Sequence, residues 1–400
     1  MRLKGFQLLL LLGALGGSCL AADWPQWRGP KRNGISSETI APFPPSGPKL
    51  LWSASVGTGF SAISISQGRL YTMGNTNEHD IIWCLDAATG REIWKHTYAS
   101  RLDPQYYEGG PGATPTVEDG KVITISKWGT VLCLAAATGS KVWEHNLWDE
   151  GIRSNRWGFA GSPLIWHDLV ILNAGSTGTA LERATGRMAW FNGTNPAGYA
   201  SPALVNINGK EIVLIFAAKH LVAVDPKTGR ELWRHPFETG YDTNNSDPLV
   251  QGDKVFISSF TRGCALLRIH LDRAEVVYEK DVLHNHLSPG ILFGDYVYAF
   301  NGEAKTKTDF RCLHLPTGEV KWTTKTPAFG SLIGLGENRL LILSDRGELT
   351  LAAASPEEFK PLARAQVMGG ICWTPPTIAH GRIYVRNAKG VLKCFETIPQ

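Results

Sequence analysis

A short phrase recurs along the chain, and its spacing constrains the fold more than any other feature. Its five clear copies are DAATGREIW, AAATGSKVW, ERATGRMAW, DPKTGRELW and HLPTGEVKW, at Asp86–Trp94, Ala135–Trp143, Glu182–Trp190, Asp225–Trp233 and His314–Trp322. A degraded copy, HLDRAEVVY, occupies His270–Tyr278. The spacing of roughly 43–49 residues is typical of repeat architectures, and short strands within each repeat favour a β-propeller.

Each repeat also opens with a predicted hairpin. TPTVEDGKVITIS (Thr114–Ser126) and PPTIAHGRIYVRN (Pro375–Asn387) place alternating apolar residues on both sides of a turn that contains glycine. A third strand follows, then the Thr-Gly turn and a short strand that ends in tryptophan, so four strands match one blade. The turn glycines are expected to need positive φ, and the tryptophans to fill the space between blades. These glycines are Gly90, Gly139, Gly186, Gly229 and Gly318, and the tryptophans are Trp94, Trp143, Trp190, Trp233 and Trp322.

The number of repeats predicts an all-β, eight-bladed β-propeller of four-stranded blades. The hairpins open near Ser61, Thr114, Ser162, Ser201, Asp247, Ser288, Ser331 and Thr374. The last copy stops after its third strand, at Val391–Thr397, whereas Lys49–Gly57 carries the tryptophan strand with no hairpin before it. Pairing these two ends would close the ring and leave no open edge. We therefore predict a signal peptide at 1–22, an N-terminal extension at 23–48 and one propeller at 49–400.

The first residues and the charge indicate an exported protein. Met1–Ala22 has Arg2 and Lys4, then an apolar run and small residues, as in a secretory signal. A lipid anchor on Cys19 is a minority alternative, because Gly16 stands where such signals usually have leucine. We expect no transmembrane segment and a monomer. The formal net charge of +4, two of it from the leader, disfavours nucleic-acid binding.

The cysteines are expected to be small buried residues rather than a disulfide or metal framework. Cys84, Cys133, Cys312 and Cys394 fall at the same place in the third strand of four different blades. Equivalent positions in separate blades do not bring Cα atoms within the roughly 4.4–6.8 Å that a disulfide requires. The chain has no CxxC, no CxxCH and no adjacent pair of cysteines.

The AxTGxxxW phrase resembles the quinoprotein repeat of pyrroloquinoline-quinone (PQQ) dehydrogenase propellers. That repeat also occurs in secreted PQQ-like propellers without known redox chemistry and in the outer-membrane assembly lipoprotein of the Bam complex. The resemblance covers nearly the whole chain after the leader. The segments DWPQWRGPKRNGIS (Asp23–Ser36), GGPGATPTV (Gly109–Val117) and RWGFAGSPL (Arg156–Leu164) are similar to a secreted bacterial PQQ-like subfamily.

The chain departs from the dehydrogenases at the residues that hold the cofactor. Those enzymes stack the quinone between a tryptophan and a vicinal Cys-Cys disulfide, beside a calcium ion and a catalytic aspartate. Here the Cys-Cys pair is missing, and no matching set of Glu, Asn and Asp stands out. We therefore expect no cofactor, and keep PQQ with Ca²⁺ as the alternative.

Candidate binding residues lie in the loops that enter the innermost strands. In a propeller these loops converge at one end of the central channel, which we call the channel mouth. The aromatic and polar residues expected there are Tyr107, Glu108, Arg156, Trp157, Tyr199, Asn245, Asp247, His284, His286 and Trp373. Flat rings with a few charged groups would suit a small polar ligand such as a sugar, whereas residues that merely shape the turns are the plainer alternative.

The His284 and His286 pair has a spacing that can ligate a metal, but no third ligand is evident, so we predict no metal site. The chain shows no nucleophile elbow, phosphate loop or HExxH motif. The first hypothesis is a non-catalytic module that binds a small polar ligand or another protein at the channel mouth. The alternatives are a periplasmic PQQ-dependent oxidoreductase of alcohols or sugars and an outer-membrane assembly scaffold.

Overall fold

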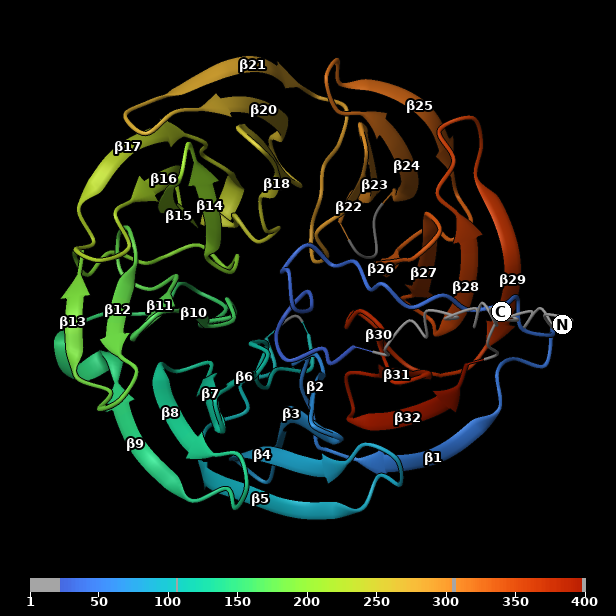
Figure 1. Ribbon diagram of the computed structural model, residues 1–400, viewed down its shortest axis with the longest axis horizontal. Coiled ribbons are helices and arrows are strands. Elements are labelled where there is room, and N and C mark those ends of the chain that lie inside the picture. Colours follow the sequence, from blue (N-terminus) through green and yellow to red (C-terminus); the bar gives the residue numbers. More distant parts are fainter. Residues whose placement is uncertain (1–21, 106, 304–306, 398–400) are drawn as a thin grey trace, which may run out of the picture.

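The computed structural model describes residues 22–105, 107–303 and 307–397, and these residues form eight four-stranded antiparallel sheets. The sheets stand in a ring around a central axis, with one short strand of each nearest the axis (Figure 1). The architecture predicted from the repeats, an eight-bladed propeller, is confirmed. The predicted signal peptide lies almost wholly in residues 1–21, outside the described residues.

The strands of each blade follow one another in the chain, from the axis outward. Blade 1 contains β2 (Ser64–Ser66), β3 (Arg69–Thr76), β4 (His79–Asp86) and β5 (Glu92–Ala99), and blade 2 contains β6 (Thr116–Glu118), β7 (Lys121–Ile125), β8 (Thr130–Ala135) and β9 (Lys141–Asn146). Blade 3 contains β10 (Leu164–Trp166), β11 (Leu169–Leu172), β12 (Thr179–Glu182) and β13 (Met188–Phe191), and blade 4 contains β14 (Ala203–Ile207), β15 (Lys210–Phe216), β16 (His220–Val224) and β17 (Glu231–Pro236).

The second half of the ring repeats this order. Blade 5 contains β18 (Leu249–Gln251), β19 (Lys254–Ser259), β20 (Gly263–Ile269) and β21 (Ala274–Lys280), and blade 6 contains β22 (Ile291–Phe293), β23 (Tyr296–Asn301), β24 (Asp309–His314) and β25 (Glu319–Thr324). Blade 7 contains β26 (Gly330–Leu335), β27 (Arg339–Ser344), β28 (Glu348–Ala353) and β29 (Lys360–Gln366), and blade 8 contains β30 (Thr377–Ala379), β31 (Arg382–Arg386), β32 (Val391–Glu396) and β1 (Leu50–Ser55). Two short 3₁₀ helices, η1 (Leu147–Glu150) and η2 (Gly240–Asp242), lie in loops, and no helix of the described residues is long and apolar enough to cross a membrane.

Blade 8 is built from both ends of the chain, as predicted. Strand β1 pairs with β32 in antiparallel register, with Trp52 opposite Cys394 and Ser55 opposite Val391. The fully buried Arg386 of β31 then ties this blade to blade 1. Its guanidinium donates to the carbonyls of Gly57, Gly59, Ser61 and Met73 and to the Thr72 hydroxyl, at 2.7–3.1 Å. The junction that closes the ring therefore has its own polar clasp.

The repeated tryptophans pack between neighbouring blades. Trp94 of blade 1 is 7% exposed, and its Nε1 donates to the Ala136 carbonyl of blade 2 at 2.9 Å. Gly139, at φ 71°, lies so close to the Trp94 ring that an added Cβ would be 2.5 Å from it. Gly186, Gly229 and Gly90 repeat this contact with Trp143, Trp190 and Trp52. The Thr-Gly turn thus needs glycine both for its backbone and for the tryptophan face beside it.

The inter-blade role predicted for these tryptophans is confirmed, with one weaker case. Trp143, Trp190 and Trp233 are 7–9% exposed, but Trp322 is only partly buried. In the degraded copy, Tyr278 takes the place of tryptophan, and its hydroxyl donates to the Leu315 carbonyl at 2.8 Å. The cysteines of the described residues are all buried and carry free thiols, and Cys84, Cys133, Cys312 and Cys394 lie inside strands, as predicted.

Residues 23–40, which we call the N-terminal segment, run through the centre of the ring. Asp23 accepts from the Gln67 N–H at 3.0 Å and contacts His380 at 2.7 Å, in the hairpin turns at the end opposite the mouth. The segment then pairs with inner strands of blades 1 and 7, through bridges from Trp24 to Ile65 and from Ile35 to Gly334. Figure 1 shows this stretch, in blue, inside the ring. The sequence assigned no role to it.

Candidate functional site at the channel mouth

A row of small polar side chains marks where the chain enters the innermost strands. The N–H of Ala62 donates to Thr114 Oγ1 at 3.2 Å, and the N–H of Thr114 donates to Ser162 Oγ at 2.9 Å. The same bond joins Ser162 to Ser201 at 3.0 Å and Ser201 to the Asp247 carboxylate at 2.7 Å. Blades 2, 3, 4 and 5 thus each supply an acceptor for the backbone of the blade before. This explains Thr114, Ser162, Ser201 and Asp247 at the openings of four of the predicted hairpins.

Asp247 faces the N-terminal segment rather than open solvent. Trp27 Nε1 donates to its Oδ2 at 2.5 Å, while its Oδ1 accepts from Ser201. Burial raises the pKa of Asp247, and the nearby cations Arg28 and Arg32 oppose that rise. Burial in turn lowers the pKa of Arg32 to about 10. Asp247, one of the predicted ligand-binding residues, holds the N-terminal segment through Trp27, and a ligand contact of its own stays a prediction.

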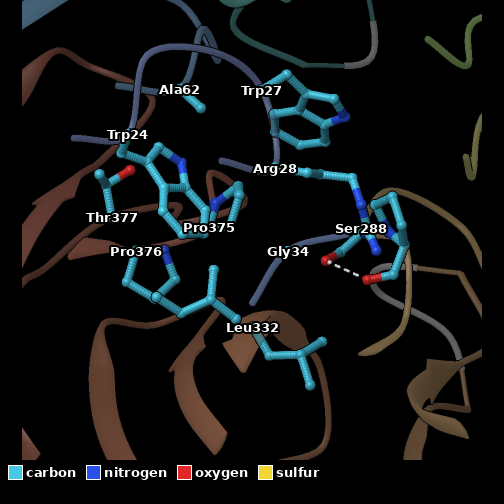
Figure 2. Close-up of a pocket in the computed structure, with 12 residues that line it drawn as sticks. Trp24, Trp27, Arg28, Gly34, Ala62, Ser288, Leu332, Pro375, Pro376 and Thr377 are labelled. Atoms are coloured by element: carbon cyan, nitrogen blue, oxygen red, sulfur yellow. Dashed lines mark hydrogen bonds between the residues drawn. The ribbon is translucent and has the colours of Figure 1, made fainter. Parts of the chain in front are cut away.

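Arg28 and its neighbours fill the centre of the ring. Its guanidinium donates to the Gly290 carbonyl of blade 6 at 3.1 Å and to the Asn33 carbonyl at 2.9 Å. Figure 2 shows Trp24, Trp27 and Arg28 around one cavity, which Ala62, Ser288, Leu332 and Thr377 of several blades also line. The cavity that they line holds about 20 Å³, which is room for about one water molecule.

Aromatic side chains form a connected row around the mouth, which we call the mouth arc: Phe60, Tyr107, Trp157, Tyr199, Tyr241 and Trp373. Phe60 stacks on Trp373 with ring centroids 5.3 Å apart, and Tyr107 lies 5.6 Å from Phe60. The row is continued by a hydrogen bond of 3.4 Å from the Tyr107 hydroxyl to the Trp157 carbonyl. These residues come from loops far apart in the sequence, so the ring brings them together as predicted for four of them.

Trp157 is the centre of this arc. Its ring lies 6.0 Å from that of Tyr199 and 6.4 Å from that of Tyr241, almost perpendicular to the latter. The backbone N–H of Trp157 donates to the Tyr199 hydroxyl at 3.2 Å, and the Arg156 guanidinium lies 5.3 Å from the centre of the Trp157 ring. Burial raises the pKa of Tyr199, so that hydroxyl stays protonated. Tyr241 is 68% exposed and has φ 64°, a left-handed conformation that is rare for a bulky residue and is typical of functional loops.

Three of the predicted polar residues carry a buried atom that has no hydrogen-bond partner among the described residues. These atoms are Glu108 Oε2, Asn245 Oδ1 and His286 Nδ1. Glu108 follows Tyr107, and Asn245 follows Asn244, whose carbonyl accepts from the Tyr199 N–H at 2.8 Å. His286 belongs to the same arc of loops, because the neighbouring Asn285 bonds to Ser246. Unpartnered buried atoms also occur elsewhere among the described residues, for example Ser331 Oγ and Arg386 Nε, so these three atoms mark candidate positions for a polar partner.

The two histidines of the HxH pair do different things. His286 packs on Phe260 with ring centroids 4.5 Å apart, and burial lowers its pKa to about 4, so the ring is neutral near pH 7. His284 is held by the Phe260 carbonyl at 3.0 Å and by Asp281 at 2.8 Å. The described residues contain no cluster of three His, Cys, Asp or Glu that could hold a metal ion. Of the two histidines, His284 is held by its neighbours, and only His286 has a ring nitrogen, Nδ1, without a hydrogen-bond partner among the described residues.

Lys127 adds a charge that sequence reasoning missed. Its side chain is 3% exposed, and its Nζ lies 2.9 Å from Asp103 Oδ2 and 5.1 Å from the Tyr107 ring. The hydrogen bond from Lys127 holds the pKa of Asp103 below its usual range.

The sequence analysis also did not single out the aromatic residues Phe60, Phe260 and Tyr241. Phe60 and Tyr241 follow a glycine in an entry loop, as Tyr199 does, and this shared pattern could have identified them.

The family to which the chain belongs follows from its repeats and fold. The family profile described as outer membrane protein assembly factor BamB, PQQ_2, matches residues 78–324. The chain is a member of this PQQ-like propeller family. The match covers the blades that carry the AxTGxxxW phrase, so the resemblance inferred from those motifs is confirmed. Among curated proteins, no significant match was found.

Solved structures with the same fold include both assembly factors and dehydrogenases. BamB from Moraxella catarrhalis is 17% identical with a TM-score of 0.65, over 88% of this chain and 100% of that chain. The quinohemoprotein alcohol dehydrogenase from Comamonas testosteroni is 14% identical with a TM-score of 0.67, and the match covers 94% of this chain and 81% of the dehydrogenase chain. A europium-containing methanol dehydrogenase is 12% identical with a TM-score of 0.68, and the match covers 91% of this chain and 89% of the dehydrogenase chain. At such identities these structures show a shared fold only.

Proposed function

We propose that this PQQ-like propeller is a non-catalytic binding module whose site is the channel mouth. The observation that carries the proposal is the set of buried, unpartnered atoms of Glu108, Asn245 and His286 on one rim. Aromatic rings of the mouth arc lie in loops at the same end of the ring and offer flat apolar faces. A rigid ring that carries polar groups and aromatic rings in the loops at one end has the composition of a small-molecule site.

The residues at the centre of the ring do not fit a bound quinone, which supports binding without redox chemistry. Trp24, Trp27 and Arg28 occupy the centre, and the cavity beside them, at about 20 Å³, is far too small for a tricyclic cofactor. The cysteines of the described residues are unpaired, so they supply no vicinal disulfide on which a quinone could stack. The described carboxylates also form no cluster suited to calcium.

The experiment that tests this proposal adds PQQ and Ca²⁺ to the purified protein and records the absorbance spectrum and dye-linked oxidation of alcohols and sugars. We expect neither a quinone band nor turnover. A variant that lacks residues 23–40 serves as the matched comparison, because it removes the groups that fill the centre. Stoichiometric PQQ binding by the full chain, with oxidation of an alcohol, would replace the binding-module proposal with the oxidoreductase one.

A second candidate function, protein binding as part of an assembly scaffold, has its own support. Trp128 and Trp148 lie edge to face at 6.5 Å on blade 2, outside the mouth arc. Arg101 lies over Trp128 at 4.6 Å, and Arg153 lies over Trp148 at 4.8 Å. Tryptophan and arginine are the residues most enriched at the centres of protein interfaces.

Co-purification separates the two candidates. A defined protein partner that is lost with Trp148→Ala and Arg153→Ala, but retained with Glu108→Gln, would favour the scaffold. A partner whose binding does not depend on Trp148 and Arg153 would count against this surface.

We also propose that the protein acts outside the cytoplasm. The proposal rests on the leader-like residues Met1–Ala22 and on a family described by an outer-membrane assembly factor. Fractionation of cells that express the full chain, with N-terminal sequencing of the product, tests it. A product that begins near Asp23 in the exported fraction is expected, and an unprocessed cytoplasmic protein would contradict it.

A further inference from the structure

Positive charge gathers at the centre of the channel mouth, where the N-terminal segment turns back on itself. The N–H of Arg32 donates to the Gly29 carbonyl at 3.0 Å, and the N–H of Gly34 donates to the Arg28 carbonyl at 2.9 Å. We call residues 28–34 the central turn. We propose that the central turn binds a small, doubly charged oxyanion of the phosphate or dicarboxylate kind. This inference rests on the proposed binding function and specifies the ligand at the centre of the mouth.

Two hydrogen bonds place the central turn at the mouth. Arg32 Nη1 donates to the Pro163 carbonyl at 3.0 Å, and Arg28 Nη2 donates to the Gly290 carbonyl at 3.1 Å. Both carbonyls come directly before innermost strands, β10 and β22, so they belong to the entry loops. Lys31, between the two arginines, is exposed. The turn is therefore fixed among the entry loops, with its tip open to solvent.

The charges of the central turn are not balanced by carboxylates. Arg28, Lys31 and Arg32 carry three positive charges, whereas the carboxylate that acts on both arginines is Asp247. The arginines bond to neutral carbonyls and to the Gln26 amide, and none of the three cations forms an ion pair with a described carboxylate. Burial lowers the pKa of Arg32 to about 10, so its guanidinium still carries its charge near pH 7. A buried charge without a partner is costly, so an anion bound here would stabilise the turn.

The turn also offers hydrogen-bond donors that have no acceptor. Arg32 Nη2 is buried and makes no hydrogen bond to a described residue, although Nη1 of the same guanidinium makes two. The ammonium of Lys31, the preceding residue, makes none with the described residues either. Guanidinium and ammonium groups are the usual partners of phosphate and carboxylate oxygens. The unpartnered atom is informative here because it lies in the same short turn as an unpaired ammonium and an excess of positive charge.

The backbone of the central turn is left-handed at both arginines. Arg28 has φ 62° and Arg32 has φ 51°. This conformation is uncommon for residues other than glycine, asparagine and aspartate, and it clusters at functional sites. A neutral amide side chain could donate to the same carbonyls, so the hydrogen bonds alone do not account for two buried charges in these positions. Binding of an anion would account for both.

The space around the turn limits the size of the ligand. The cavity that Arg28 lines, drawn in Figure 2, holds about 20 Å³ and has room for about one water molecule. The ligand must therefore lie on the solvent side of the turn, where Lys31 and Asn33 are exposed. A compact oxyanion needs only a few donors from one turn, so it suits this place better than a large flat molecule.

The test uses isothermal titration calorimetry with inorganic phosphate and succinate as dianions, choline as a cation and cellobiose as a neutral compound. We expect saturable binding of at least one dianion and none of choline. Lys31→Gln should weaken dianion binding about three- to fivefold, as expected for one exposed charge pair. Arg32→Gln should weaken it about tenfold or more, because hydrogen bonds to charged groups are stronger. Lys227→Gln, which removes an exposed lysine from the Thr-Gly turn of blade 4, is the matched control and should leave binding unchanged.

The outcomes separate this inference from the proposed function. Absence of dianion binding, or binding that Lys31→Gln leaves unchanged, would overturn the anion site. An equal loss in Lys227→Gln would indicate a general effect of charge and would overturn it too. Binding of choline or cellobiose alone, weakened by Trp157→Ala, would overturn the anion class and keep the mouth as a binding site. Circular dichroism checks the fold of Arg32→Gln, which also loses its bond to Pro163, and Lys31→Gln decides the test if that variant does not fold.

Discussion

Replacing the turn glycine of blade 2 with alanine tests the contact that repeats around the ring. Gly139 has φ 71°, and an added Cβ would lie 2.5 Å from the Trp94 ring. Gly120, in the same blade, has φ 70° but nothing within 4 Å of its added Cβ. The two substitutions therefore share the cost of a left-handed alanine, about 1–2 kcal/mol, and differ only in the overlap with tryptophan.

The overlap sets the expected magnitude. A methyl group forced into a packed interior costs about 1–3 kcal/mol, so Gly139→Ala should destabilise the protein by that much more than Gly120→Ala. The assay is guanidinium unfolding followed by circular dichroism, with the midpoint and slope compared for both variants. In a Trp94→Ala background, which itself should cost about 3–5 kcal/mol, the extra penalty of Gly139→Ala should disappear.

Two results would refute this reasoning. If Gly139→Ala and Gly120→Ala had the same unfolding midpoint, the ring face would not be what excludes a side chain at this turn. If the extra penalty persisted after removal of the Trp94 ring, its cause would lie in the backbone of the turn and not in the inter-blade contact.

Three further predictions concern one group each at the closure of the ring, in its centre and at the channel mouth. Arg386→Met should destabilise the protein by about 3–5 kcal/mol, because buried carbonyls lose their donor, and thermal unfolding that is unchanged would contradict the clasp. Trp27→Phe should cost about 1–3 kcal/mol through the unpaired oxygen of Asp247, and a stability equal to wild type would show that this contact is not formed in solution. Because burial lowers the pKa of His286 to about 4, below its unfolded value of about 6.5, the unfolded state binds the proton first. Stability should thus be full above about pH 6.5 and fall by up to about 3 kcal/mol towards pH 4, and His286→Asn should flatten this slope in urea midpoints measured across that range.

The sequence predicted the ring because its repeats are local. The Thr-Gly turn and the tryptophan each make one contact that recurs in several blades, so a single rule describes most of the interfaces. It also predicted β1 in blade 8, because one strand was missing at the C-terminus and one was left over near the N-terminus. Trp322, which is less buried than the other repeat tryptophans, shows that the local context of a copy still varies.

The site was predicted less completely because its contacts are not periodic. The entry-loop position identified Tyr107, Trp157 and Tyr199, but nothing in the sequence shows that Trp27 reaches Asp247 across the chain. Asp247 therefore looked like a free carboxylate. Whether the remaining polar residues of the mouth bind a ligand stays a prediction, since a pattern of residue types does not contain the identity of a second molecule.

The pairing of β1 with β32 has a consequence for the order in which the chain folds. Leu50 lies opposite Phe395, so the strand made early in synthesis waits for a partner made near the end. Until then β1 has no partner in blade 8, and the open edges of a partial ring are available for pairing with other chains. Contacts so distant in sequence also slow folding. A nascent chain of this protein should therefore depend on protection from aggregation until its last strand emerges, when the first strand to be made can pair with the last.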